Sequence, residues 1–97
     1  MARLILSTAE GQQAIELRPI NSLGRHPNNS IQLLDKIVSK EHCILEQRDG
    51  AFVLRDLGSL NGTYIGGRGR LGRDQLYKLN DRDQVVFGGA TFEFRKG

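Results

Sequence analysis

The residues best suited to catalytic or metal chemistry in this 97-residue chain are two histidines, His26 and His42, and the single cysteine, Cys43. A metal site needs several His, Cys or carboxylate side chains at a recognisable spacing, and these three residues do not supply one. His42 and Cys43 are adjacent, so on a strand they would point to opposite faces and could not act together. His26 is left open as a partner that approaches Cys43 from elsewhere in the fold. We therefore expect no enzyme, no metal and no cofactor.

A second candidate for chemistry is the glycine-rich segment around Gly66, Gly67 and Gly69. A nucleotide-binding phosphate loop would continue with Gly-Lys-Ser/Thr and open a helix, and neither feature follows here. The turn chemistry of glycine instead favours a connection between two strands.

The elements that must position any site are short strands. Twelve glycines are spread along the chain, and they interrupt any helix of useful length. Phe92 and Phe94 alternate with polar residues, as on a strand with one buried face, and Asp49-Gly50 is a strong signal for a two-residue hairpin turn. The pattern predicts an all-β antiparallel sandwich. The expected strands cover residues 2–7, 13–18, 31–34, 43–48, 51–56, 63–65, 84–87 and 91–95.

Length and composition indicate one ordinary globular domain over residues 1–97, which we expect to serve as a module of a larger signalling protein. The net charge of +3 favours acidic partners only in a general way. One cysteine excludes an intramolecular disulfide and suits a reducing compartment. No apolar run approaches the roughly 18 residues that span a bilayer, so we expect a cytoplasmic protein without membrane contact.

Three short polar motifs lie at predicted loops: Gly24-Arg25, Ser39-Lys40-Glu41-His42, and the segment 56–63, which reads Asp-Leu-Gly-Ser-Leu-Asn-Gly-Thr. In this order and spacing, on an all-β background, they resemble the forkhead-associated (FHA) domain family. Ile31-Gln32-Leu33 and the segment 80–85 also fit the family, so the likeness covers nearly the whole chain. The resemblance implies a sandwich of about eleven strands whose loops at one end bind a phosphothreonine peptide.

The resemblance also implies roles for the motif residues. A phosphate with three acceptor oxygens requires a planar bidentate donor, hydroxyl donors and free backbone N–H groups. Arg25 would supply the bidentate donor, Ser39 a hydroxyl, and Lys40 a basic side chain. Asn61 would hold the main chain of the peptide, since its amide offers both a donor and an acceptor. Leu60 stands where many relatives carry threonine or a basic residue, so it offers the phosphate only its backbone N–H.

Other motif residues are expected to support the site rather than to touch the ligand. By the resemblance, His42 braces the binding loops through hydrogen bonds. Gly24 and Gly62 give the backbone its freedom to turn, and Ser59 orders its own loop together with Asp56. The expected support residues are therefore Gly24, His42, Ser59 and Gly62. Gly66 stands where many relatives have a further asparagine, which predicts fewer contacts to the peptide main chain.

Two alternatives to a phosphothreonine-binding module in Ser/Thr kinase signalling stay open. One is a phospho-independent FHA-like scaffold, against which the intact Arg25, Ser39 and Asn61 argue. The other is a nucleic-acid binder that uses Arg68, Arg70 and Arg73. No exposed ladder of aromatic residues accompanies these arginines, so we expect no nucleic-acid partner.

Overall fold

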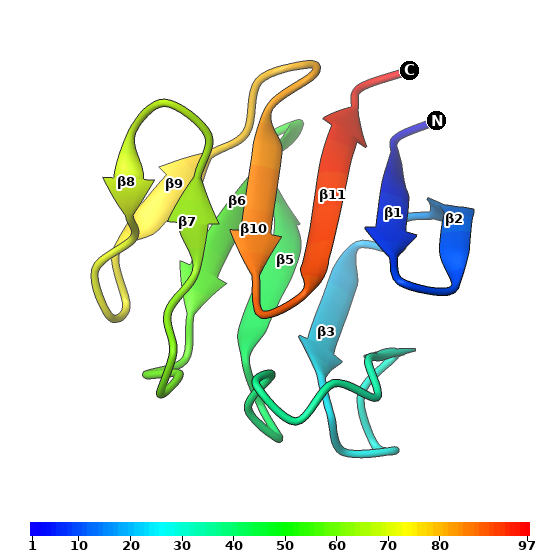
Figure 1. Cartoon of the computed structure of the whole chain (residues 1–97). Coiled ribbons are helices and arrows are strands. Elements are labelled where there is room, and N and C mark those ends of the chain that lie inside the picture. The colour runs from blue at the N-terminus through cyan, green and yellow to red at the C-terminus, as the bar shows by residue number, and fades with distance from the viewer.

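The computed structural model describes residues 1–97 as a sandwich of two β-sheets without helices (Figure 1). One sheet has six strands in the order β2-β1-β11-β10-β7-β8, and the other has five in the order β4-β3-β5-β6-β9. Paired strands are antiparallel except for β3 and β4, which run parallel. The bounds are β1 Arg3–Thr8, β2 Gly11–Glu16, β3 Ile20–Gly24, β4 Ile31–Gln32, β5 Cys43–Arg48, β6 Ala51–Asp56, β7 Tyr64–Ile65, β8 Gly69–Arg70, β9 Leu76–Lys78, β10 Gln84–Phe87 and β11 Ala90–Arg95. The predicted all-β sandwich of about eleven strands is confirmed.

The predicted hairpin between β5 and β6 is also confirmed. Both strands have the predicted bounds, and their register pairs Arg48 with Ala51 across the turn. Asp49 has φ = 50° and Gly50 has φ = 79°, the two positive values that a type I′ turn requires.

Three strands, β3, β8 and β9, were not predicted from the sequence, and each omission has a physical reason. In β3 the inward-facing Asn21 interrupts the apolar alternation. Its Nδ2 donates to the carbonyls of Arg18 and Leu45, and its Oδ1 accepts from the Arg18 N–H, so the polar side chain is buried at low cost. β8 has only two residues, both exposed, and β9 is a three-residue edge strand with one exposed leucine, Leu76. Segments this short carry no periodicity.

The remaining predicted strands exist with shifted ends. β2 begins at Gly11 instead of residue 13 and is exposed along most of its length, so no buried face fixes its limits in the sequence. β4 is limited to Ile31–Gln32, because the chain then turns away into a long loop. The shifts at the other strands are of one residue.

The core lies between the sheets and is built from alternate residues of the strands. Phe92 and Phe94 of β11 are buried as predicted, and they face Phe87 and Phe52 with ring centroids 5.3 and 5.8 Å apart. The imidazole of His42 joins this core, with its ring 4.8 Å from that of Phe87. The fold contains no helix that is long and apolar enough to cross a membrane.

The loops that carry the three motifs gather at one end of the sandwich. They follow β3, precede β5 and follow β6, and Figure 1 shows all three at the bottom of the view, with both chain ends at the top. The predicted site residues, far apart in the sequence, therefore belong to one end of the molecule.

Candidate functional site

The loop after β3 and the loop before β5 are in van der Waals contact at Gly24. A Cβ built on Gly24 would lie 2.2 Å from the carbonyl oxygen of Lys40 and 2.8 Å from Nδ2 of Asn29. Asn29 Nδ2 donates to that same Lys40 carbonyl across 2.7 Å, and to the carbonyl of His26 across 2.8 Å. Glycine is thus needed at position 24 for close approach of two backbones rather than for an unusual φ angle.

Arg25 is half-buried, and its guanidinium is held by one edge. The Nε–H donates to the carbonyl of Val38 across 3.1 Å, and the backbone N–H donates to the carbonyl of Ser39 across 3.0 Å. No protein acceptor occupies its two terminal Nη groups. The side chain is therefore oriented in advance, with the two groups that can bind an oxyanion as a fork left free.

The carbonyl groups of residues 37–40 all accept hydrogen bonds from other loops. The Ile37 oxygen accepts from Asn61 Nδ2, and the Val38 and Ser39 oxygens accept from Arg25. The Lys40 oxygen accepts from Asn29 Nδ2 and from the N–H of His26. The N–H groups of Ile37, Val38 and Ser39 are occupied as well, by Asp35 and His42, so the free backbone donor of this segment is the N–H of Lys40.

Ser39 and Leu60 connect the second loop to the third. The backbone N–H of Leu60 donates to Oγ of Ser39 across 3.1 Å. The hydroxyl hydrogen of Ser39 stays available for a ligand, and the backbone N–H of Lys40 has no acceptor within the protein. The Leu60 N–H, which we expected to face the phosphate, is instead occupied by Ser39 while the leucine side chain is 83% exposed.

Asn61 lies exposed at the edge of the site. Its Nδ2 donates to the carbonyl of Ile37 across 2.9 Å, which fixes the amide plane. Its Oδ1 accepts no bond from the protein. The side chain therefore offers an oriented acceptor to a peptide N–H, together with its second Nδ2 hydrogen.

His42 is fully buried, and its two ring nitrogens connect the second and third loops. The N–H of Ser39 donates to Nδ1 across 3.1 Å, and Nε2 lies 3.0 Å from the carbonyl of Gly62. An accepting Nδ1 carries no hydrogen, so the ring is neutral and Nε2–H donates to Gly62. Burial lowers the pKa of His42, while the bond to Gly62 and the charge of Asp56 act in the opposite direction.

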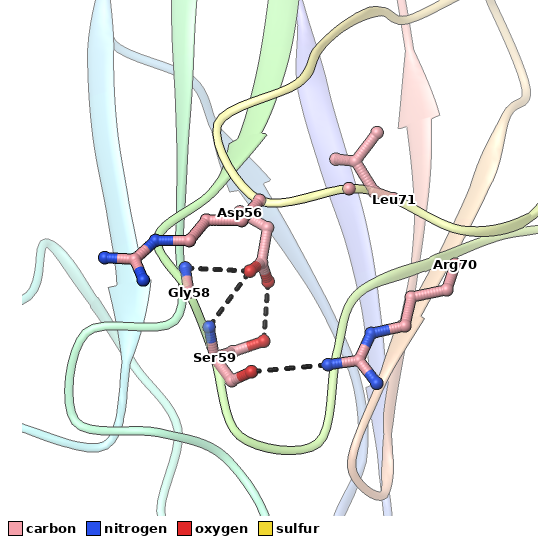
Figure 2. A pocket seen from close by; sticks show the side chains of 7 residues that line it. Asp56, Gly58, Ser59, Arg70 and Leu71 are labelled. Carbon is pink, nitrogen blue, oxygen red and sulfur yellow. Dashed lines mark hydrogen bonds between the residues drawn. The ribbon is translucent and has the colours of Figure 1, made fainter.

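Asp56, the last residue of β6, holds the third loop through its carboxylate (Figure 2). Its carboxylate accepts four hydrogen bonds: from the hydroxyls of Ser59 and Thr63 at 2.6 and 2.8 Å, and from the N–H groups of Gly58 and Ser59 at 2.9 Å each. Burial raises the pKa of Asp56, but these four donors outweigh it, and the pKa lies below its usual value. The Ser59 hydroxyl also accepts from the N–H of Gly62 across 3.1 Å, and this bond closes the turn that contains Asn61.

Two further residues of the site were not recognised in the sequence. Asn29 bridges the first two loops, as described above. Asp35 accepts from the N–H groups of Ile37 and Gly89 at 2.9 and 2.7 Å, so it fixes the start of the segment 37–40 to the turn between β10 and β11. These backbone bonds lower the pKa of Asp35. Asn29 lies in an Asn-Asn-Ser sequence and Asp35 in a Leu-Asp-Lys sequence. Both sequences are common in loops, so neither indicates the distant residue to which the side chain bonds.

The pairing of His26 with Cys43, which the sequence left open, does not occur. Cys43 is completely buried, and burial raises the pKa of its thiol. His26 is exposed, and its Nδ1 accepts from the N–H of Asn28 across 3.0 Å. A buried thiol without a base is chemically inert.

The arrangement of three loops around Arg25, Ser39 and His42 agrees with the comparison to known proteins. The family model described as FHA domain matches residues 21–88. The chain belongs to the FHA domain family. As a family member it has its motif residues on the loops described above, and the predicted resemblance is confirmed.

Named relatives of this FHA domain are regulators. It is 38% identical over 80 residues to the oxoglutarate dehydrogenase inhibitor of Corynebacterium diphtheriae, covering 82% of this chain and 53% of that protein. It is 46% identical over 48 residues to the glycogen accumulation regulator GarA of Mycolicibacterium smegmatis, covering 50% of this chain and 30% of that protein. The chain spans about half the length, or less, of the curated relatives it matches.

Solved FHA domains share the whole fold. The FhaA FHA domain, complexed with the intracellular domain of Rv3910, superposes with a TM-score of 0.84 at 27% identity, covering 98% of this chain and all of that one. A structure from a study of phosphothreonine-dependent FHA domain interactions gives the same TM-score and identity, with 97% and 94% covered. The similarity extends over both sheets and the loops between them.

Proposed function

We propose that this FHA domain is an interaction module that binds a phosphothreonine-containing segment of another protein in Ser/Thr kinase signalling. The observation that carries the proposal is the state of Arg25. One edge of its guanidinium is held by Val38, while both Nη groups stay free, and the backbone N–H of Arg25 donates to the carbonyl of Ser39, whose hydroxyl hydrogen is also free. Such an oriented fork with adjacent hydroxyl and N–H donors suits a dianionic phosphate.

The proposed roles follow from the contacts. Arg25, Ser39 and the N–H of Lys40 bind phosphate oxygens, and the Lys40 side chain adds positive charge. Asn61 contacts the main chain of the peptide through its free Oδ1. The backbone N–H of Leu60 does not contact the phosphate itself; it donates to Ser39 Oγ and so orients the hydroxyl that does. Gly24, His42, Ser59 and Gly62 maintain the loop geometry without contacting the ligand.

Two features of the relatives support this proposal. Relatives are named inhibitor and regulator, which suits an interaction module that is not itself an enzyme. One matched structure comes from work on phosphothreonine-dependent interactions of FHA domains. The predicted cytoplasmic location accords with a partner phosphorylated by an intracellular kinase.

Titration calorimetry with matched peptides tests the proposal. One neutral peptide is prepared with phosphothreonine, phosphoserine, threonine or glutamate at its central position. We expect binding only of the phosphorylated forms, with phosphothreonine at least severalfold tighter, because its methyl group adds about 0.8 kcal/mol of burial and its β-branch restricts χ1. Equal binding of the unphosphorylated peptide would favour the phospho-independent scaffold instead.

Arg25→Ala is the matched protein variant, and it should weaken phosphopeptide binding by about 30-fold or more. The control is Arg48→Ala, which removes the same charge at the β5–β6 hairpin, at the opposite end of the sandwich. Loss of affinity in both variants to the same degree would indicate non-specific attraction of a basic protein for phosphate.

A further inference from the structure

The two sheets end in four edge strands, and only one of these strands is long. The edge strands β4, β8 and β9 have two or three residues each, whereas β2 has six. Figure 1 shows β2 at the outer margin of its sheet, beyond β1. Natural sheets protect a long edge with proline, lysine or a bulge, but β2 contains neither residue and pairs with β1 without interruption from Gly11 to Glu16. This edge is therefore open to another strand.

The register shows which backbone groups of β2 point away from β1. The N–H of Leu17 donates to the carbonyl of Ala2 across 3.0 Å, so these two residues are a hydrogen-bonded pair. Such pairs recur at every second residue of an antiparallel ladder. Residues 11, 13 and 15 therefore bond to β1, while the N–H and C=O groups of Gln12, Ala14 and Glu16 point outward. Outside the ladder, no other part of the chain bonds to these outward groups.

The side of β2 that faces the other sheet borders a groove. The groove has a volume of about 700 Å³ and runs between the β1–β2 hairpin and the segment that follows β4. Its lining includes Gln13 of β2 and the apolar Leu6, Leu33 and Leu34, the last of which is 86% exposed. A strand added to β2 would direct every second side chain toward this groove, since side chains alternate across a sheet. The groove thus gives the inward-facing residues of an added strand room and apolar contact.

The sequence of β2 is complementary to itself when two copies of the strand run antiparallel. Pairing the outward groups of Ala14 with those of Ala14 in a second copy places a two-fold axis at this small residue. Gln12 then lies opposite Glu16 of the second copy. Both residues point their backbone groups outward, so the new ladder contains about six hydrogen bonds. On the side of the groove, Gln13 lies opposite Ile15 of the second copy.

Two charges favour this register over its neighbours. The same pairing sets Glu10, in the turn before β2, beside Arg18 of the second copy, and the two-fold axis creates this contact twice. Both side chains are exposed, and neither forms an ion pair within its own chain. Sliding the pairing by two residues in one direction would set Glu10 opposite Glu16, which brings like charges together. Sliding it the other way would require the backbone groups of Arg18, which already bond to Asn21.

We propose that two copies of this chain associate through β2 and join their six-stranded sheets into one continuous sheet across a two-fold axis. The inference does not depend on the proposed function, because β2 contributes nothing to the phosphate site. Antiparallel pairing points the motif loops of the two copies in opposite directions, so the dimer presents two separate binding ends. The interface is narrow, and we expect a weak dimer with a dissociation constant between about 1 µM and 1 mM.

Sedimentation equilibrium of the chain at concentrations up to about 1 mM tests the association. We expect the average mass to rise from that of one chain toward that of two. Ala14→Pro removes an outward N–H that bonds to nothing within the domain, so this variant should stay folded by circular dichroism and remain monomeric. Ala14→Ser keeps the N–H and is the matched control, which should dimerise as the wild type does.

Two charge reversals test the register and leave the backbone unchanged. Glu10→Arg and Arg18→Glu each place like charges at both contacts, so each variant alone should associate about threefold more weakly than the wild type. An equimolar mixture of the two should recover the affinity, because opposite charges then meet at both contacts. Both variants keep a net positive charge, so overall attraction cannot cause the recovery. Glu41→Arg makes the same change in net charge away from β2 and should dimerise normally.

Hydrogen exchange assigns the association to β2. The N–H of Ala14 should exchange more slowly as the concentration rises, while that of Ile15, already bonded to β1, should not change. A chain that stays monomeric up to about 1 mM would overturn the proposal and leave this edge to an extended segment of another protein. A dimer that survives Ala14→Pro, or in which the Ala14 N–H stays unprotected, uses another surface and overturns the proposal as well. A mixture of the charge variants without recovery would contradict the proposed pairing.

Discussion

The backbone N–H of Ser39 donates to Nδ1 of His42 across 3.1 Å, and this bond determines the protonation of a fully buried ring. The other nitrogen donates to Gly62, so the imidazole connects the loop of Ser39 with the loop of Asn61 only in its neutral form. A proton on Nδ1 would remove the acceptor for Ser39 and bury a charge against Phe87.

The first prediction is that stability falls as the pH drops below the ordinary pKa of histidine, about 6.5. The pKa of His42 is lowered in the fold, chiefly by burial, so the unfolded chain binds more protons in this range. The contribution of His42 is therefore present in full above pH 6.5 and is lost as the pH falls toward its folded pKa. Denaturant unfolding between pH 5 and pH 8 measures the slope.

His42→Gln is the control for that slope, since glutamine does not titrate and His26 is unchanged. The variant should be less stable at pH 8 and should show a shallower fall between pH 6.5 and pH 5. The carboxylate of Asp56, whose pKa is also low, loses its contribution only at more acidic pH. Parallel curves for the two proteins would contradict the assigned tautomer.

The second prediction is that Arg25→Lys fails to preserve binding of a phosphothreonine peptide. A single ammonium group cannot bond to the Val38 carbonyl and also present two parallel donors to a phosphate. We expect affinity to fall by about tenfold or more, with a thermal midpoint close to that of the wild type. Calorimetry and thermal melts provide the two numbers, and an affinity within threefold of wild type would rule out the fork.

The third prediction concerns Gly24→Ala. A methyl group 2.2 Å from the Lys40 carbonyl forces the first two loops apart, so we expect a loss of about 1–3 kcal/mol in the free energy of unfolding together with weaker binding. Gly66→Ala is the matched control, because its Cβ would meet nothing closer than 3.4 Å and its φ is not positive. Chemical denaturation of both variants measures the difference, and equal stabilities would show that the loops separate without cost.

The fourth prediction is that Leu60→Thr strengthens phosphopeptide binding severalfold. The backbone of Leu60 contacts Ser39, while its exposed side chain contributes no donor; a threonine hydroxyl adds a hydrogen bond to a charged group, worth about 1.5–3 kcal/mol at most. Calorimetry with the same peptide measures the gain, and Leu60→Val serves as a control of similar shape without the hydroxyl. A gain in the valine variant as well would point to side-chain shape rather than hydrogen bonding.

Sequence patterns predicted the strands that have one buried and one exposed face. β5, β6 and β10 have the predicted limits because apolar alternation and flanking turn residues coincide there. β3 was not predicted because Asn21 points inward, where three hydrogen bonds replace apolar contact. The partners of these hydrogen bonds are the backbone groups of Arg18 and Leu45. Leu45 is distant in the sequence, so a local pattern around Asn21 cannot indicate it.

For the site, the sequence indicated which residues lie at the loops but not how they contact each other. The motif residues occupy one end of the fold, yet the bond from Leu60 to Ser39 crosses 21 positions and that from Gly89 to Asp35 crosses 54. Contacts at that separation depend on the packing of both sheets.

The pairing of β1 with β11 sets Arg3 opposite Arg95, so both chain ends leave the sandwich side by side at the pole away from the loops (Figure 1). A domain with adjacent ends can be inserted into a surface turn of a host protein with little distortion of either fold. Fluorescent reporters joined to the two ends would likewise sit clear of the peptide. The sandwich is therefore suited to serve as the sensing element of an engineered phosphorylation reporter.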